Sequence, residues 1–266
     1  MIGKTLDYPK SYFEHQVFSD IESMREFYDD LTMGCFTFIP TGTSAVLNYA
    51  SYVYSAIEGT LDSMDTLLKK GRINDAYVLV RKMFDDILVE IYIDVVRKEK
   101  YDWMEKRIVE DAESWLKGRI RIPKIKLLLK FLQDANCTKD IYPYFGWETY
   151  LKNNRELLDD SVHSNRYSRL LLNCSDVAIP DREKHLQNID IVLKQIFTIH
   201  ISFIFHLNPE YLMSSDYMDY INTGETPPKG CENWIAPYAQ KTFDKYIKPH
   251  DSLAKFIKGT CHLEIN

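Results

Sequence analysis

The most constraining feature of the sequence is a pair of long stretches, within residues 44–97, in which apolar side chains recur every three or four residues. That spacing is the repeat of an amphipathic α-helix. The first stretch carries Val46, Ala50, Val53, Ile57, Leu61, Met64 and Leu68, and the second carries Tyr77, Val80, Phe84, Ile87, Ile91 and Val95. Gly71 lies between them, where a left-handed helix C-terminus belongs, and Asn74 or Asp75 is suited to cap the second helix. The sequence predicts a helical hairpin.

The second helix of this hairpin is expected to be buried on most of its sides. Val78, Met83, Val89 and Ile93 lie off its main apolar face, and a helix that is apolar nearly all round belongs in a core. Arg81 and Asp85 stand four residues apart beside that face, where an unpaired charge is costly. They are interpreted either as a salt bridge that fixes the register of the helix or as the lining of a pocket.

The remaining sequence predicts an all-α protein, a helical bundle built on the long antiparallel helix hairpin with an irregular C-terminal appendage. A capping box, Ser19-x-x-Glu22, opens a short helix that Gly34 ends. Further helices are expected over residues 102–117, 123–132, 147–163 and 186–207, with short ones near 236–246 and 252–258. Residues 1–209 are predicted to form the bundle domain, and residues 210–266, rich in Pro and Gly, an appendage packed on it.

Charge and cysteine content restrict the classes of function. A net charge of −6 argues against a strongly basic nucleic-acid footprint over the whole chain, although it leaves room for a local basic patch. The five cysteines are scattered without a C-x-x-C motif, which is typical of reduced thiols in a cytoplasmic protein. The longest uncharged apolar run, residues 195–207, is too short to span a bilayer, so no membrane partner is expected.

The richest polar cluster lies near the end of the helix predicted for residues 147–163. Its candidate functional residues are Arg155, Asp159, Asp160, His163, Asn165 and Arg166. An arginine can hold a phosphate and a histidine can transfer a proton near neutral pH, a combination suited to metal-independent RNA cleavage by the 2′-hydroxyl. On an ideal helix His163 lies about 80° round from Arg155. The alternative is a polar helix end whose histidine caps carbonyls.

Other chemistries have less support in the sequence. Asp160-x-x-His163 resembles half of a carboxylate–histidine pair, but a di-iron bundle needs a second such motif and two further Glu residues. His200 and His206 are interpreted as satisfied core histidines, and His250-Asp251 as an isolated dipeptide. Phosphate-loop, Rossmann and serine-hydrolase motifs are absent from the sequence. We therefore predict no metal site and no cofactor.

The hairpin, with Asp75-Ala76 and Arg81 on its second helix, and the later segment from Leu157 to Asn165 resemble HEPN-type helical proteins of bacteria, especially their larger relatives. The resemblance covers residues 44–207 and implies an RNase of a defence or stress system or, where activity is lost, a protein that binds nucleotides or partners. It also implies a homodimeric site in which an Arg and a His, with four to six residues between them, act together. Here seven residues separate Arg155 from His163, and Glu156 replaces the usual polar residue after the Arg.

Two classes of function therefore remain open. In the first, a HEPN-like protein cleaves RNA or binds a nucleotide: Arg155 binds phosphate and His163 acts as general acid–base. Arg81 or Asn165 assists, and Asp85, Asp159 and Arg166 complete the binding site. In the second, the chain is a non-catalytic helical module that binds a protein partner. The acidity of the chain, the wide Arg–His spacing and the lack of any basic run favour the second class, and the resemblance favours the first.

Overall fold

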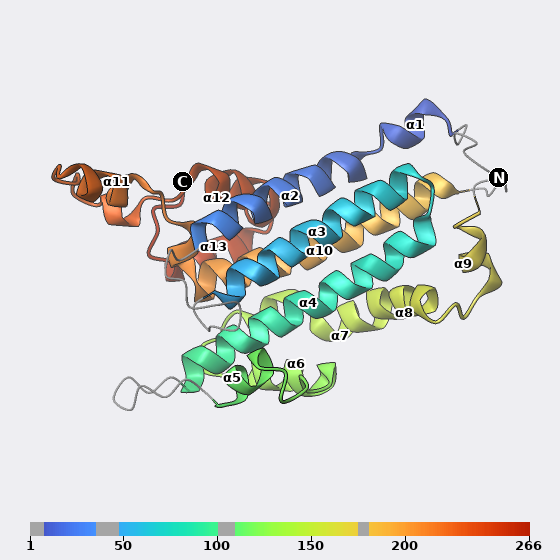
Figure 1. Cartoon of the computed structure of the whole chain (residues 1–266), viewed down its shortest axis with the longest axis horizontal. Coiled ribbons are helices and arrows are strands. Elements are labelled where there is room, and N and C mark those ends of the chain that lie inside the picture. The colour runs from blue at the N-terminus through green and yellow to red at the C-terminus, as the bar shows by residue number, and fades with distance from the viewer. Residues whose placement is uncertain (1–7, 36–47, 101–109, 175–180) are drawn as a thin grey trace. The chain divides into compact units, whose positions relative to one another are not determined.

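A computed structural model describes residues 8–35, 48–100, 110–174 and 181–266. Within these ranges the protein is helical, and the only β-pairing consists of the isolated bridges Met213–Ile235 and Trp234–Glu264 (Figure 1). The all-α prediction is confirmed. The α-helices are α1 Lys10–Phe13, α2 Gln16–Cys35, α3 Tyr49–Lys69, α4 Ile73–Lys100, α5 Glu110–Leu116, α6 Ile125–Asp134, α7 Trp147–Tyr150, α8 Glu156–Val162, α9 Tyr167–Leu171, α10 Arg182–Leu207, α11 Asp216–Thr223, α12 Pro237–Thr242 and α13 Asp251–Thr260. Short 3₁₀ segments are η1 Tyr142–Phe145, η3 Pro209–Leu212 and η4 Cys231–Asn233, and π-helical turns are η2 Leu151–Arg155 and η5 Phe243–Ile247.

The predicted hairpin is present as α3 and α4. Gly71 adopts φ of 69°, its N–H donates to the Leu68 carbonyl at 2.8 Å, and the Arg72 N–H donates to the Leu67 carbonyl at 2.9 Å. A Cβ at Gly71 would lie 1.9 Å from the Tyr8 hydroxyl oxygen, so glycine is needed both for the left-handed backbone and for this close approach. α4 begins at Ile73, before Asn74 and Asp75, so neither residue is its N-cap.

Burial follows the predicted helix faces. The described members of the α3 face are buried except Val53, which is half-buried, and all six members of the α4 face are buried. Met83 and Ile93 are buried as well, so α4 is enclosed on most sides, as predicted. Val46 lies outside the described residues.

Two other helix predictions need correction. The N-terminal helix is longer than predicted: α2 begins before Ser19, whose hydroxyl donates to the Gln16 carbonyl at 2.9 Å inside the helix, and continues through Gly34. The helix expected over 147–163 is divided into α7, the π-helical turn η2 and α8. Of the helix expected over 102–117, α5 is described, and its first part lies outside the described residues.

The chain forms two compact units, each assembled from three separate segments. Unit 1 comprises Met1–Asp29, Val53–Ile87 and Phe145–Phe197, and unit 2 comprises Asp30–Tyr52, Leu88–Tyr144 and Thr198–Asn266. The helices α2, α3, α4 and α10 contribute residues to both units. Residues 210–266 belong to unit 2, and the domain boundary at residue 209 stays a prediction.

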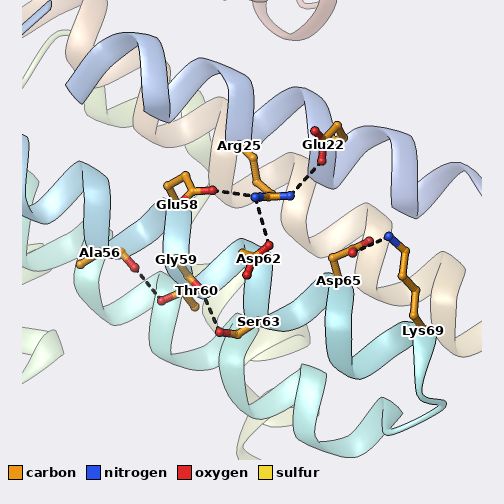
Figure 2. Close-up of polar contacts among 10 residues, drawn as sticks. All are labelled: Glu22, Arg25, Ala56, Glu58, Gly59, Thr60, Asp62, Ser63, Asp65 and Lys69. Atoms are coloured by element: carbon orange, nitrogen blue, oxygen red, sulfur yellow. Dashed lines mark hydrogen bonds and ion pairs between the residues drawn. The ribbon is translucent and has the colours of Figure 1, made fainter. Parts of the chain in front are cut away.

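In unit 1, aromatic and polar contacts join α2, α3 and α10. The Phe27 and Phe197 rings pack edge to face with centroids 5.3 Å apart, and Tyr28 lies 5.6 Å from Phe197. On the surface, Arg25 of α2 forms ion pairs with Glu58 and Asp62 of α3 and with Glu22 of its own helix, at 2.9, 3.0 and 3.0 Å (Figure 2). Partly exposed pairs of this kind contribute little individually, so apolar burial accounts for most of the stability.

In unit 2, the C-terminal residues pack on the end of α10. Phe243 contacts Phe205 with ring centroids 5.6 Å apart, Phe256 contacts His206 at 5.4 Å, and the Tyr238 hydroxyl donates to the Tyr211 carbonyl at 2.8 Å. By length and composition α10 could cross a membrane, but 72% of its most apolar window is buried inside the protein. The interpretation of α10 as a core helix is confirmed.

Candidate functional site

The predicted polar cluster lies in unit 1 around the C-terminal end of α8. Arg155 is the last residue of the π-helical turn η2, and single π-helical turns within helices are frequent at functional sites. His163 follows α8 as its C-cap, with φ of −95° and ψ of 1°. Ser164 then takes φ of 50°, so the chain turns sharply, and residues 162–168 are all exposed. The local backbone therefore presents a short, solvent-facing polar segment directly after the helix.

Asp159 connects two arginines from different parts of the sequence. Its Oδ2 accepts from Arg155 Nε at 3.4 Å, and its Oδ1 accepts from Arg81 Nε at 2.9 Å. Arg81 also forms an ion pair with Asp85, one helical turn further along α4. The salt-bridge interpretation of Arg81 and Asp85 is confirmed, and the same guanidinium also joins α4 to α8.

The environment of Arg81 favours its charged form. Burial of the guanidinium, which is 11% exposed, would lower the pKa of Arg81, but hydrogen bonds and ion pairs with Asp85 and Asp159 more than offset this and raise the pKa. Since both carboxylates occupy the guanidinium, Arg81 is placed to orient Asp159, which in turn holds Arg155.

Asp160 contacts the residues that follow the end of α8. Its carboxylate forms an ion pair with Arg166 Nε at 2.9 Å and accepts a long hydrogen bond from the Asn165 amide at 3.4 Å. Because the Arg166 side chain is 70% exposed, the guanidinium stays accessible to solvent in spite of the pair. The predicted binding residues thus separate into two groups, one centred on Asp159 and one on Asp160.

His163 belongs to neither group. Its backbone N–H donates to the Asp159 carbonyl at 3.0 Å, and its exposed side chain makes no hydrogen bond with the part of the chain that the structure describes. Eight residues at 1.5 Å per residue place it about 12 Å further along the helix axis than Arg155. The imidazole is therefore accessible to a ligand, and its backbone lies more than two helical turns from Arg155.

A second polar cluster, whose members are too far apart in the sequence to be predicted as a unit, lies in unit 2. We call it the buried network; its buried members are Tyr49, Glu90, Asp94, His200 and Asn208, and the half-buried Arg97 lies at its edge. Asp94 accepts hydrogen bonds from the Tyr49 hydroxyl and the Asn208 amide, and Arg97 Nη1 lies 3.2 Å from its Oδ1. His200 Nε2 lies 3.1 Å from Glu90 Oε2, which agrees with its interpretation as a satisfied core histidine.

Burial shifts the titration of the buried network strongly. It raises the pKa of Asp94 to about 8, with a further contribution from the nearby Glu90 and an opposing one from Arg97. It also lowers the pKa of His200 to about 3, although the negative charge of Asp94 works in the opposite direction. Near neutral pH, both Asp94 and His200 are therefore largely uncharged. Glu90 and Asp94 were detectable as a carboxylate pair four residues apart on an apolar helix, but their partners are distant in the sequence.

No group of three His, Cys, Asp or Glu residues suited to hold a metal ion occurs among the described residues. Asp160 and His163 therefore lack a further such ligand within that part of the chain. Within the described residues, neither polar cluster contains the set of ligand atoms that a metal centre needs.

Part of the chain is similar in sequence to a known endoribonuclease. Over 118 residues the chain is 26% identical to the CRISPR-associated endoribonuclease Cas13a of Paludibacter propionicigenes. The match covers 44% of this chain and 10% of the relative, so the similarity spans only about a tenth of that protein's length. No protein-family model and no solved structure matches the chain.

Proposed function

We propose that the chain is a HEPN-like endoribonuclease of a defence or stress system that cleaves RNA without a metal ion. The observation that carries the proposal is the helix end at which His163 is exposed, with Arg155, about two helical turns earlier, held by Asp159. The sequence similarity to an endoribonuclease supports the same class of reaction.

In the proposed reaction the RNA 2′-oxygen attacks the adjacent phosphorus. A bond forms between O2′ and phosphorus, the bond between phosphorus and O5′ breaks, and the products are a 2′,3′-cyclic phosphate and a free 5′-hydroxyl. The 2′-hydroxyl loses a proton and the departing O5′ gains one. His163 supplies this general acid–base function, and Arg155 stabilises the negative charge that develops on the phosphate oxygens.

We propose further that the active site is formed between two copies of the chain. Within one chain Arg155 and His163 lie about 12 Å apart along the helix axis, so a second copy can bring an Arg155 closer to a given His163 than the same chain does. In an isologous dimer, Arg155 of one copy can face His163 of the other, and the symmetry generates two equivalent sites. Asp159 and Arg81 are positioning residues in this arrangement, because they contact Arg155 or its partner rather than the RNA.

The test is cleavage of single-stranded RNA by the purified full chain in the presence of EDTA. We expect products with 2′,3′-cyclic phosphate ends, and we expect His163→Ala to reduce the rate by at least about 100-fold. His262→Ala is the matched control, since His262 is also exposed. Intact RNA with the wild-type chain, or equal cleavage by wild type and His163→Ala, would refute the proposal.

A mixing experiment tests the shared site. Arg155→Ala and His163→Ala should each be inactive alone. Random reassociation of the two variants restores one intact site in each mixed dimer, so about a quarter of the wild-type activity should return. If the mixture stays inactive under conditions that exchange subunits, both residues act within one copy or not at all.

The second candidate, a non-catalytic module that binds a protein partner, is favoured by one observation. α11 has no buried residue, and it exposes Met218 and Ile221, whose side chains are 54% and 47% accessible. Exposed apolar side chains on one short helix are a common element of protein recognition. Intact RNA after incubation with the wild-type chain would support this second candidate over the ribonuclease.

A further inference from the structure

Positive charge is concentrated in one short part of this acidic chain. Residues 117–130 contain Lys117, Arg119, Arg121, Lys124, Lys126 and Lys130 and no Asp or Glu. The rest of the chain holds 27 Lys and Arg residues against 39 Asp and Glu residues, so its formal charge is −12. These cations do not form a continuous basic run because apolar residues separate them. We call residues 117–130 the basic segment; it lies in unit 2.

Four cations of the basic segment are available to a ligand. Arg119, Arg121, Lys124 and Lys126 are all exposed, and none forms an ion pair with a described residue. Lys130 is paired with Asp134 one helical turn away, at 3.2 Å, but that pair is highly exposed and therefore weak. Since each of the four can contact an anion without breaking an internal ion pair, the segment can bind a polyanion at little internal cost.

The fold places two of these cations, Lys124 and Lys126, on a defined surface at the start of α6. Leu128, Leu129 and Leu132 of α6 are buried, which fixes one face of the helix against the protein and leaves Lys124 and Lys126 on the solvent side. An interfacial membrane helix needs its apolar face free to enter lipid, and in α6 that face is already occupied. Leu127 of α6, 62% accessible, is left as a single exposed apolar side chain on the helix. The arrangement suits a polyanion in water better than a lipid surface.

We propose that the basic segment binds the phosphate backbone of single-stranded RNA without reading its sequence. The choice of RNA among polyanions rests on the proposed ribonuclease function. The charge and exposure of Arg119, Arg121, Lys124 and Lys126 supply the affinity, because each contacted phosphate releases condensed counterions. The segment would hold substrate in addition to the residues that cleave it.

The proposal has a quantitative signature in salt dependence. For single strands, the logarithm of the binding constant falls with the logarithm of salt concentration with a slope of about −0.7 for each phosphate neutralised. Replacing four contacting cations by Gln should therefore make the slope shallower by about 2.8. At 0.1 M salt the same relation predicts that affinity falls on the order of 100-fold or more.

The experiment measures fluorescence anisotropy of a labelled, 2′-O-methylated single strand of about 20 nucleotides, a length that covers a typical single-strand site. Methylation blocks attack by O2′, so binding is measured on the full chain without cleavage. The test variant combines R119Q, R121Q, K124Q and K126Q. The control combines K70Q, K184Q, K229Q and K255Q, which remove the same charge from exposed lysines elsewhere.

We expect the test variant to show the shallower slope and the affinity loss, and the control to bind like wild type. A charge-conserving variant, R119K with R121K, should also bind like wild type. If the fourfold variant does not fold, K124Q with K126Q alone should make the slope shallower by about 1.4. Equal losses in test and control variants, or binding to vesicles of anionic lipid without binding to the oligonucleotide, would overturn the proposal.

Binding and cleavage are separate readouts. If the wild-type chain binds the methylated strand through the basic segment but leaves ordinary RNA intact, the ribonuclease proposal is wrong and the binding proposal stands. If the chain cleaves RNA but the fourfold variant binds normally, the basic segment is not the binding surface, and the ribonuclease proposal stands.

Discussion

His163 in unit 1 and His200 in unit 2 show how differently one residue type is used in this chain. His163 is exposed at a helix end and its side chain makes no hydrogen bond with a described residue, whereas His200 is fully buried and bonded to Glu90. Burial lowers the pKa of His200 to about 3, so this imidazole is neutral near pH 7. A buried, bonded histidine stabilises a core, while an exposed one is available for proton transfer.

The largest expected effect concerns Arg155. Arg155→Ala should lower the rate of RNA cleavage by about 100- to 1,000-fold, because a charge that stabilises the developing phosphate anion is lost. The unfolding free energy should change by no more than about 0.5 kcal/mol, as for other surface substitutions. Cleavage rates and thermal unfolding of the same preparation measure both. A large loss of stability would show that Arg155 has a structural role rather than a catalytic one.

Asp94→Ala should affect stability. Removing the carboxyl leaves the Tyr49 hydroxyl, the Asn208 amide and the Arg97 guanidinium without their shared acceptor in a buried site. We expect a loss of about 3 kcal/mol in unfolding free energy, measured by denaturant titration. For a chain of this size that corresponds to a fall in Tm of about 6 to 12 °C. A change below about 1 kcal/mol would mean that the buried network is not a structural core.

The buried network also predicts a pH dependence of stability. The pKa of Asp94 is raised to about 8 in the folded chain, so between its ordinary value and pH 8 the folded state holds a proton that the unfolded state has lost. Stability should therefore fall as pH rises through this window, by at most about 1.4 kcal/mol per pH unit. The lowered pKa of His200 has the opposite effect below its ordinary value of 6.5, so the decline should be clear from pH 6.5 to 8. It should disappear in Asp94→Asn.

The smallest effect is expected for Asp159→Asn. Arg81 keeps its ion pair with Asp85, and the Asp159 side chain is 35% exposed, so the unfolding free energy should drop by about 1 kcal/mol or less. The loss of activity should be larger than this loss of stability when both are expressed as free energies, because Arg155 loses the carboxylate that orients it. Comparing KM with kcat separates the two roles: misorientation of Arg155 should lower kcat, and an unchanged kcat would remove Asp159 from the site.

Local sequence pattern predicted the long helices but not the contacts that form the sites. The spacing of Ile57, Leu61 and Met64 predicted the α3 face because helical periodicity depends only on near neighbours. The π-helical turn before α8 could not be predicted, since a one-residue change in hydrogen bonding leaves no periodic signal. The Arg81–Asp85 pair was predictable from its spacing of four residues, while the contact between Arg81 and Asp159 joins segments 78 residues apart.

The contacts of the buried network could not be predicted for the same reason. Its carboxylates lie on α4, and their partners Tyr49, His200 and Asn208 come from other parts of the chain. Which polar residues pair inside a core depends on tertiary packing that no single-sequence pattern encodes. The C-terminal residues gave a similar difficulty: α11 was not predicted, because eight residues without a buried side chain carry a weak signal.

The most direct test of the contrast between His163 and His200 is the accessibility of each histidine to a chemical reagent. Diethyl pyrocarbonate modifies exposed imidazoles, and mass spectrometry of the digested full chain reports each site with and without the methylated single strand. We predict that His163 is modified in the free protein and protected by the strand, that His262 is modified in both, and that His200 is modified in neither. Modification of His200 in the folded chain, or equal modification of His163 with and without the strand, would contradict the account.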